Sequence, residues 1–344
     1  MSRIVSLQIL RGFAATLVAG FHLYAAAIEE GFNPGLFWIF AGGEIGVDIF
    51  FVVSGFIIFY VVQSRPNMTW RDFIQARFWR ILPPYWAILT LYILAAVAFA
   101  AFLGDSSKLP DRQTLLVSFL LLPYPDHVIT IAWTLSVEIL FYAIFALAYF
   151  SGGSRRIVIV MIVWVILSQV FTFVTDKPAW LLLPLHTAVL EFLFGILIAI
   201  RFLSSGPESP RLHLSALIFG GAGVGAYLAS GGGHAGPFGR EMVAGIPSAL
   251  LVYGALGFAL KGKSILEAWG DSSYILYLFH ILYFSVVGKA INLMTGVNVY
   301  GSQVGLIAML STVVAISHLA TVHLERPYQK WYKQFFSPHS KAET

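Results

Sequence analysis

The sequence predicts an all-α integral membrane protein, a bundle of about ten transmembrane helices with both termini in the cytoplasm. Of its 344 residues, 58% are hydrophobic and only 11% are charged, too few to cover the surface of a soluble protein of this size. Apolar runs long enough to cross about 30 Å of hydrocarbon recur along the whole chain. Lysine and arginine gather in alternate loops, as the positive-inside rule requires. The chain has no cysteine, which excludes thiol catalysis and a disulfide scaffold.

The predicted spans follow one another with polar connections between them. They lie near residues 5–27, 38–62, 84–103, 131–150, 156–174, 180–202, 212–230, 241–260, 272–290 and 303–323. The apolar segment 114–122 is too short to cross the bilayer and predicts an interfacial or re-entrant helix. No separate soluble domain is expected, so residues 1–344 form one polytopic domain with a short basic tail from about 326 onward.

The distribution of cations orients the chain. With the N-terminus in the cytoplasm, most cations face inward, and the outward-facing ones are Lys108, Arg112, Lys177, Arg240 and Lys289. The net charge of +4 therefore reflects membrane orientation, and no nucleic-acid partner is expected. A cleavable signal peptide is an alternative for the N-terminus, because residues 25–27 are three alanines that resemble a cleavage site. Arg11 interrupts the apolar region that such a peptide needs, which favours a retained first helix.

The first predicted span carries two ionisable side chains, Arg11 and His22, on one helix face. Eleven residues at about 100° each return to within roughly 20° of the starting direction, about 16 Å along the axis. In the predicted orientation Arg11 lies toward the cytoplasm and His22 toward the outer side. The pair suits a long polar ligand lying along the helix. The alternative is that each side chain pairs with a nearby carboxylate and stabilises the bundle.

The second predicted span carries two carboxylates, Glu44 and Asp48, one helical turn apart on one face. Carboxylates in an apolar span are candidates for binding a cation, for orienting His22 or for a proton path. One of them is equally well explained as the structural partner of Arg11 or His22. The spacing does not separate these alternatives.

Three arginines, Arg71, Arg77 and Arg80, stand at the cytoplasmic entrance to the third span. Arg77 and Arg80 are three residues apart on a predicted short helix, so both guanidiniums can converge on one phosphate or pyrophosphate. Ordinary positive-inside anchoring beside Tyr85 and Trp86 fits the spacing as well.

Later spans contain further polar groups. Glu138 lies about a turn and a half inside the fourth span, where an unpaired carboxylate is costly, and is therefore a candidate site residue. No two histidines are four residues apart and no HExxH motif occurs, so no metal site is expected. The remaining groups fit packing as well as a direct role, and they are His186, Glu191, His280, His318 and His323.

A glycine-rich stretch at residues 220–225 faintly resembles a dinucleotide-binding fingerprint. It lies within an apolar span and follows no strand. Its spacing is better explained by close helix packing, for which Gly221 and Gly225 supply a small-xxx-small pattern.

Taken in order, these segments resemble the motifs of the membrane acyltransferase-3 family. Arg11 and His22, with ten residues between them, are similar to the signature of its first helix. The later matches are 46–56, Arg77-x-x-Arg80 with Pro83, 133–138 with Phe141 and Tyr142, 273–280 and 325–327. They run from residue 10 to residue 327, and the chain's length is similar to that of the exopolysaccharide acetyltransferase branch.

The resemblance implies a multi-pass enzyme of the bacterial inner (cytoplasmic) membrane. Such an enzyme moves an acyl group, usually acetyl, from cytoplasmic acyl-CoA to a hydroxyl of a surface sugar. Acetyl-CoA would be the co-substrate and a saccharide the acceptor. The enzyme would contact membrane lipid and would need no metal ion. Arg77 and Arg80 would hold the CoA phosphates with help from Arg71, and Arg11 would contact the donor further in. His22 would act as general base or as a transient acyl carrier, with Asp48 or Glu138 fixing its tautomer.

The sequence gives fewer indications of which residues bind the acceptor sugar. Residues expected to line the acceptor or reacting site are Ser54, Trp133, Tyr142, His280 and Glu44. The 104–130 loop, with Asp111, Tyr124 and Asp126, fits either a sugar-binding surface or the interfacial belt. The rival function is a proton- or ion-coupled secondary transporter or flippase, with the buried charges Arg11, Glu44, Asp48, Glu138 and Glu191 as its path. It explains those charges but not the arginine pair, and acyl-CoA binding would separate the two functions.

Overall fold

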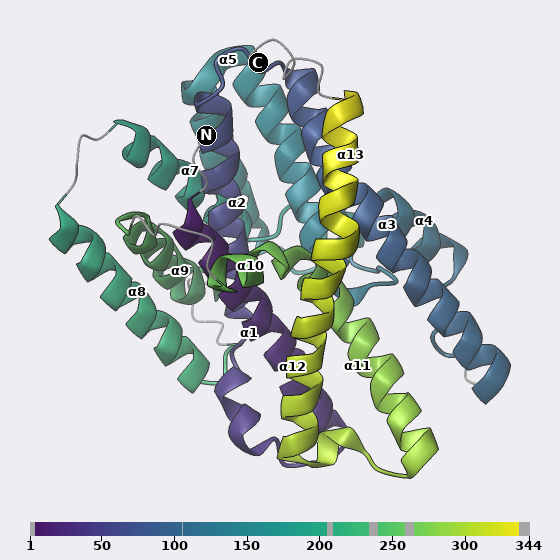
Figure 1. The fold of residues 1–344 in the computed structure, drawn as a ribbon. Coiled ribbons are helices and arrows are strands. Elements are labelled where there is room, and N and C mark those ends of the chain that lie inside the picture. Colours follow the sequence, from purple (N-terminus) through teal and green to yellow (C-terminus); the bar gives the residue numbers. More distant parts are fainter. Residues whose placement is uncertain (1–3, 105, 205–208, 234–239, 259–264, 337–344) are drawn as a thin grey trace.

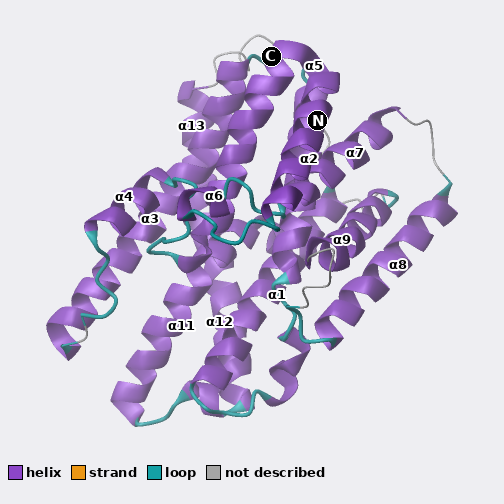
Figure 2. Ribbon diagram, turned by 180° about the vertical axis from the view of Figure 1, so that it is seen from behind, coloured by secondary structure: helices purple, strands orange, loops and turns teal. Residues whose placement is uncertain are grey.

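The computed structural model describes residues 4–104, 106–204, 209–233, 240–258 and 265–336. All regular structure in these ranges is helical, with no strand (Figure 1, Figure 2). The predicted basic tail is described only as far as residue 336. Several cations used to predict the orientation, namely Arg3, Lys261, Lys263 and Lys341, lie outside the described residues.

The helices follow the predicted spans closely in position. Their bounds are α1 Val5–Glu29, α2 Ile45–Gln63, α3 Trp70–Leu103, α4 Arg112–Leu120, α5 Trp133–Phe171, α6 Ala179–Leu182, α7 Val189–Ser204, α8 Pro210–Ala229, α9 Arg240–Leu256, α10 Ile265–Asp271, α11 Ser273–Thr295, α12 Gln303–Ala320 and α13 Arg326–Phe336. A 3₁₀ segment, Gly35–Phe40, precedes α2, and a π-helical turn, Thr321–Glu325, joins α12 to α13.

In the described residues, seven helical stretches are long and apolar enough to cross a membrane. Two of the ten predicted spans fall short because α7 has 16 residues and α9 has 17. Two others, 131–150 and 156–174, belong to the single element α5, which leaves helical geometry at Gly153 (φ 67°, ψ −164°). A positive φ is inexpensive only for glycine, so Gly153 is where the two helical segments of α5 meet. The protein is thus a multi-pass helical membrane protein, and its exact number of spans and its sidedness stay predictions.

The third helix differs from the prediction because it runs unbroken through Pro83 and Pro84. Proline has no N–H, so the carbonyl of Trp79 loses the donor that residue 83 would normally supply. The hydroxyl of Tyr328 in α13 donates to this carbonyl at 2.9 Å. The arginines of the basic motif and the aromatic residues after it therefore share one continuous helix.

Small residues allow the central helices to approach closely. Cβ atoms at Gly55 or Gly195 would come within 2.2 Å of the facing backbone, so α2 and α7 are in backbone contact. The contact between α8 and α9 uses the same device through Gly220, where a Cβ would lie 2.4 Å from the backbone nitrogen of Leu251. The predicted pattern was wrong in detail, because Gly221 and Gly225 face open space.

The orientation of the helices determines where the polar side chains of α1 lie. In Figure 1, α1 runs downward from mid-height while α12 and α13 run upward beside it. Helix α1 packs against α2, α10 and α11. The Arg11–His22 face of α1 is turned toward the interior formed by α2, α3, α5 and α11.

Candidate active site

A cavity lies between α1, α2, α3, α5 and α11. It brings together six of the residues that the sequence singled out, namely Arg11, Ser54, Arg77, Arg80, Glu138 and Tyr142. These residues come from four helices, and all were predicted to serve one site. Apolar side chains of α2 form much of the remaining wall, among them Val47, Val53, Ile57 and Ile58.

Three guanidiniums make this cavity strongly basic. The guanidinium of Arg77 lies 5.7 Å from the Phe73 ring centroid and 6.0 Å from that of Tyr142, and that of Arg11 donates to Gln8 Oε1 at 3.3 Å. Within the described residues no carboxylate forms an ion pair with Arg11, Arg77 or Arg80. The three guanidiniums outnumber the one carboxylate that lines the cavity in the described part of the chain, that of Glu138, and this excess of positive charge favours an anionic ligand.

The third predicted donor residue, Arg71, is not part of this cavity. It lies one and a half turns before Arg77 on α3, is exposed, and holds its guanidinium 5.4 Å from the ring centroid of Trp70. Contact with a ligand in the cavity would require this side chain to move.

Glu138 presents its carboxylate to the cavity with two donors fixed on one oxygen. The Tyr142 hydroxyl donates to Oε1 at 2.5 Å, and the Ser54 hydroxyl donates to the same oxygen. Each hydroxyl has a single hydrogen, so neither Ser54 nor Tyr142 has a proton left for another acceptor in this arrangement. Glu138 is therefore the shared acceptor of a hydrogen-bond network with Ser54 and Tyr142, and it does not contact His22.

Two aromatic rings line the cavity on the side nearest His280. Phe50 and Tyr277 line it there, with ring centroids 5.5 Å apart. The Thr134 hydroxyl donates to the Ile131 carbonyl at 2.9 Å, so the 2.9 Å contact with Tyr277 has the tyrosine hydroxyl as donor. This chain of hydrogen bonds fixes the Tyr277 ring in place.

His22 lies beyond these two rings and pairs with a second histidine. Its Nδ1 is 3.2 Å from Nε2 of His280 in α11, and the ring centroids are 5.0 Å apart. His280 is fully buried and touches Tyr277, with ring centroids 6.2 Å apart. His280, predicted to line the acceptor or reacting site, is thus the direct neighbour of His22, and Tyr277 connects the pair to the basic cavity.

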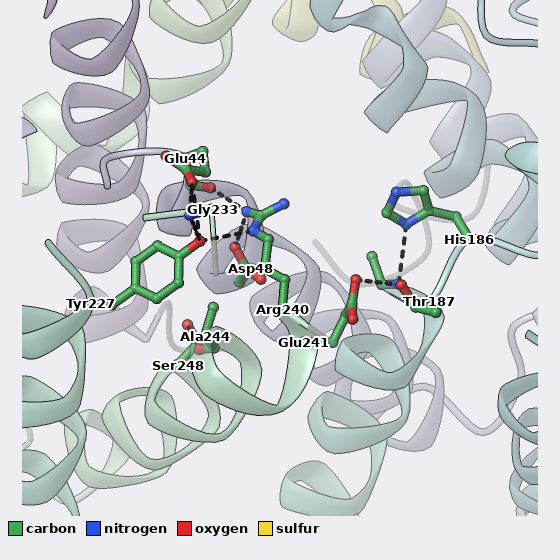
Figure 3. Close-up of polar contacts among 11 residues, drawn as sticks. Glu44, Asp48, His186, Thr187, Tyr227, Gly233, Arg240, Glu241, Ala244 and Ser248 are labelled. Carbon is green, nitrogen blue, oxygen red and sulfur yellow. Dashed lines mark hydrogen bonds and ion pairs between the residues drawn. The ribbon is translucent and has the colours of Figure 1, made fainter. Parts of the chain in front are cut away.

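The carboxylates of the second helix are engaged elsewhere (Figure 3). Asp48 forms an ion pair with Arg240 at 2.5 Å, and the same guanidinium donates to the backbone oxygen of Glu44 at 2.9 Å. Glu44 accepts from the Tyr227 hydroxyl at 3.1 Å. The expectation that Asp48 or Glu138 fixes the tautomer of His22 stays a prediction. In this structure each carboxylate has other partners, and His280 is the side chain that lies beside His22.

Trp133 was expected to line the site but packs against His186, with ring centroids 4.9 Å apart. The loop residue Asp111 caps α4, accepting from the backbone N–H of Thr114 at 2.7 Å. Among the residues that the structure describes, no group of three or more histidine, aspartate or glutamate side chains is arranged to hold a metal ion.

The sequence argument gave no role to two neighbours of the predicted site residues. Arg240 was assigned to the outer side, yet it is the ion-pair partner of Asp48 from 192 residues away. Tyr277 lay within the 273–280 match to the family, but no role was assigned to it. Pairing across such distances depends on how the helices pack, and spacing along one helix does not report it.

Comparison with known proteins bears on the whole chain. A family model for an acyltransferase domain, Acyl_transf_3, matches residues 4–322. The chain is 32% identical over 298 residues to the exopolysaccharide production protein ExoZ of Rhizobium meliloti (strain 1021), covering 84% of this chain and 90% of that protein. It is 26% identical over 358 residues to acyltransferase MdmB of Streptomyces mycarofaciens, covering 91% of this chain and 88% of that protein. No solved structure matches it.

Proposed function

The chain belongs to the acyltransferase-3 family, and on that premise we propose that it is a membrane O-acyltransferase using cytoplasmic acyl-CoA. The acyl group, acetyl in the simplest case, passes to a hydroxyl of a cell-surface or exopolysaccharide sugar. The relative named for exopolysaccharide production supports this choice of acceptor. The predicted orientation places the basic cavity toward the cytoplasm, where acyl-CoA is available, in a bacterial inner membrane.

The observation that carries the proposal is the set of guanidiniums without ion pairs around one cavity. Arg77 and Arg80 lie at its mouth and bind the phosphates of CoA, while Arg11 contacts the donor further in. A planar guanidinium can donate two parallel hydrogen bonds to the oxygens of one phosphate. The apolar wall lowers the local dielectric constant, which strengthens the attraction between these charges. The apolar wall supplied by α2 then accommodates the pantetheine arm, which carries the thioester toward Phe50 and Tyr277.

The chemistry takes place at His22. Its imidazole removes the proton of the sugar hydroxyl as that oxygen attacks the thioester carbonyl, and a C–O bond forms as the C–S bond breaks. The proton passes from His22 to the departing sulfur, so CoA leaves as the thiol. In the alternative route the imidazole carries the acyl group for a time and then transfers it to the sugar.

The acceptor approaches from the opposite end of α1. A groove there is lined by Glu29 of α1, by Glu30 directly after it, and by Lys289 and Asn292 of α11. Ala26 and Glu29 follow His22 on the same helix face, at steps of four and seven residues. Carboxylates, amides and ammonium groups are suitable hydrogen-bonding partners for sugar hydroxyls.

The test is acetyl-CoA binding to the purified protein in detergent, measured by calorimetry. We expect binding to be lost in the double variant Arg77→Ala/Arg80→Ala and retained in His22→Ala. Arg71→Ala is the matched control, because it removes a cation from the same helix outside the cavity. Absence of binding at millimolar acetyl-CoA by folded wild-type protein would contradict the enzyme and direct attention to ion-coupled transport.

A further inference from the structure

The histidine pair has a defined hydrogen-bonding direction. Nδ1 of His22 lies 2.9 Å from the Val18 carbonyl, and Nδ1 of His280 lies 3.0 Å from the Leu276 carbonyl. A carbonyl oxygen only accepts, so each neutral imidazole carries its hydrogen on Nδ1 and leaves Nε2 bare. Nε2 of His280 is therefore the acceptor in the 3.2 Å contact, and the Nδ1–H of His22 is shared between this nitrogen and the Val18 oxygen.

From this geometry we propose that His280 is the positioning residue of His22 and takes the place that a carboxylate occupies in a hydrolase triad. Together with the Val18 carbonyl, it accepts from Nδ1–H of His22, which orients the ring and leaves Nε2 of His22 available as the base. The proposal rests on the proposed function, because it concerns the same acyl transfer. It adds a role for a side chain that the sequence placed only among the residues lining the site.

A neutral partner suits this location. His280 is fully buried, and the rings of Tyr277 and Phe284 pack against it at 6.2 and 5.8 Å between centroids. An ionised carboxylate in such surroundings would pay a large desolvation cost unless a cation accompanied it. An imidazole lone pair accepts the same hydrogen bond without bringing a charge into the bundle.

The pair also explains how His22 is stabilised during the reaction. When Nε2 of His22 takes the proton of the sugar hydroxyl, the ring becomes an imidazolium and its Nδ1–H becomes a stronger donor. Val18 and His280 then both accept from it, one from its own helix and one from α11. Because the two acceptors come from different helices, they restrict rotation of the ring as well as its tautomer. Return of the proton to the CoA sulfur restores the neutral pair.

Two substitutions separate this role from simple packing. His280→Gln places an amide oxygen near the position of Nε2, whereas His280→Leu fills similar space without an acceptor. Both lose the bond to the Leu276 carbonyl, so their difference isolates the contact with His22. We expect kcat to fall about 10- to 100-fold in His280→Leu, with the KM for acetyl-CoA unchanged, and to recover largely in His280→Gln.

A readout that needs no acceptor sugar is the ¹⁵N spectrum of histidine-labelled protein, with His22 assigned by comparison with His22→Gln. The wild type should show one protonated Nδ1 and one bare Nε2 for His22. In His280→Leu the Val18 carbonyl still holds the hydrogen on Nδ1, so we expect the tautomer to stay and the Nδ1 signal to shift and broaden as its second acceptor is lost. An unchanged His22 spectrum in His280→Leu would overturn the proposal, as would equal kcat losses in the two variants. If the wild type fails to bind acetyl-CoA, the proposed function fails, while the spectrum still tests the pairing.

Discussion

Removing the Asp48–Arg240 ion pair tests whether Asp48 has a structural or a catalytic role. The side chain of Asp48 is 3% exposed and that of Arg240 is 24% exposed. Deleting one partner of a buried pair costs about 3–5 kcal/mol, and the partial exposure of Arg240 reduces this to about 2–4 kcal/mol here. Replacing both partners by leucine should cost much less than the sum of the single changes, because no uncompensated charge remains.

The single changes should not be equal. Arg240→Leu leaves Asp48 beside the fully buried Glu191, with the ion-pair partner of Asp48 removed. Asp48→Leu leaves a guanidinium that still donates to the Glu44 backbone oxygen and to Tyr227. We therefore expect Arg240→Leu to be the more destabilising of the two.

The assay is a double-mutant cycle on thermal unfolding in detergent, combined with acetyl-CoA turnover. A coupling energy of about 2 kcal/mol between the two positions, with activity retained in the folded double variant, would support a structural role. Additive single effects would refute the reasoning about the ion pair. A double variant that is stable but inactive would instead support the catalytic role that the sequence predicted for Asp48.

Three further outcomes follow from single contacts. Tyr328→Phe should lower the free energy of unfolding by about 1–2 kcal/mol, because the Trp79 carbonyl that Pro83 leaves without a helical donor loses its substitute; an unchanged melting temperature would show that this carbonyl finds another donor. Gly195→Val should separate α2 from α7 and prevent stable folding, since its Cβ would lie 2.1 Å from the Val52 oxygen, whereas Gly221→Val on open space is the matched control and should fold as the wild type does. Burial lowers the pKa of His127 to about 4 despite the neighbouring Asp126, so the unfolded chain binds the proton first and stability should fall as pH drops from about 6.5 toward 4. His127→Gln should flatten this part of a melting-temperature profile against pH, and a profile identical to the wild type would contradict the assignment.

Much of the fold was predictable because the bilayer restricts what a chain can do. Spanning segments must be helical and apolar, so composition and run length located most of the helices to within a few residues. The exceptions are α3, which begins at Trp70 and not near 84, and α7, which begins at Val189 and not near 180. Lengths near the limit were harder, as α7 and α9 show. The break at Gly153 and the continuous helix through Pro83 depend on single residues whose effect is decided by their neighbours.

The candidate cavity was also largely visible in the sequence. An ionisable group in or beside an apolar span is energetically costly and is usually retained for a function. On that ground the sequence singled out Arg11, Arg77, Arg80 and Glu138. The structure brings all four to one cavity. Their common location follows from packing α1, α3 and α5 around α2, which spacing within each helix did not specify.

The sequence by itself determined the class of the molecule, the positions of its helices and which side chains are too polar for their surroundings. Those properties depend on the free energy of placing each residue in hydrocarbon, which is a local quantity. Only the tertiary structure decided that His22 pairs with His280 and Asp48 with Arg240. A buried polar group must find a partner, but which partner it finds is set by the helix that packs against it, and this contact can lie hundreds of residues away in the chain.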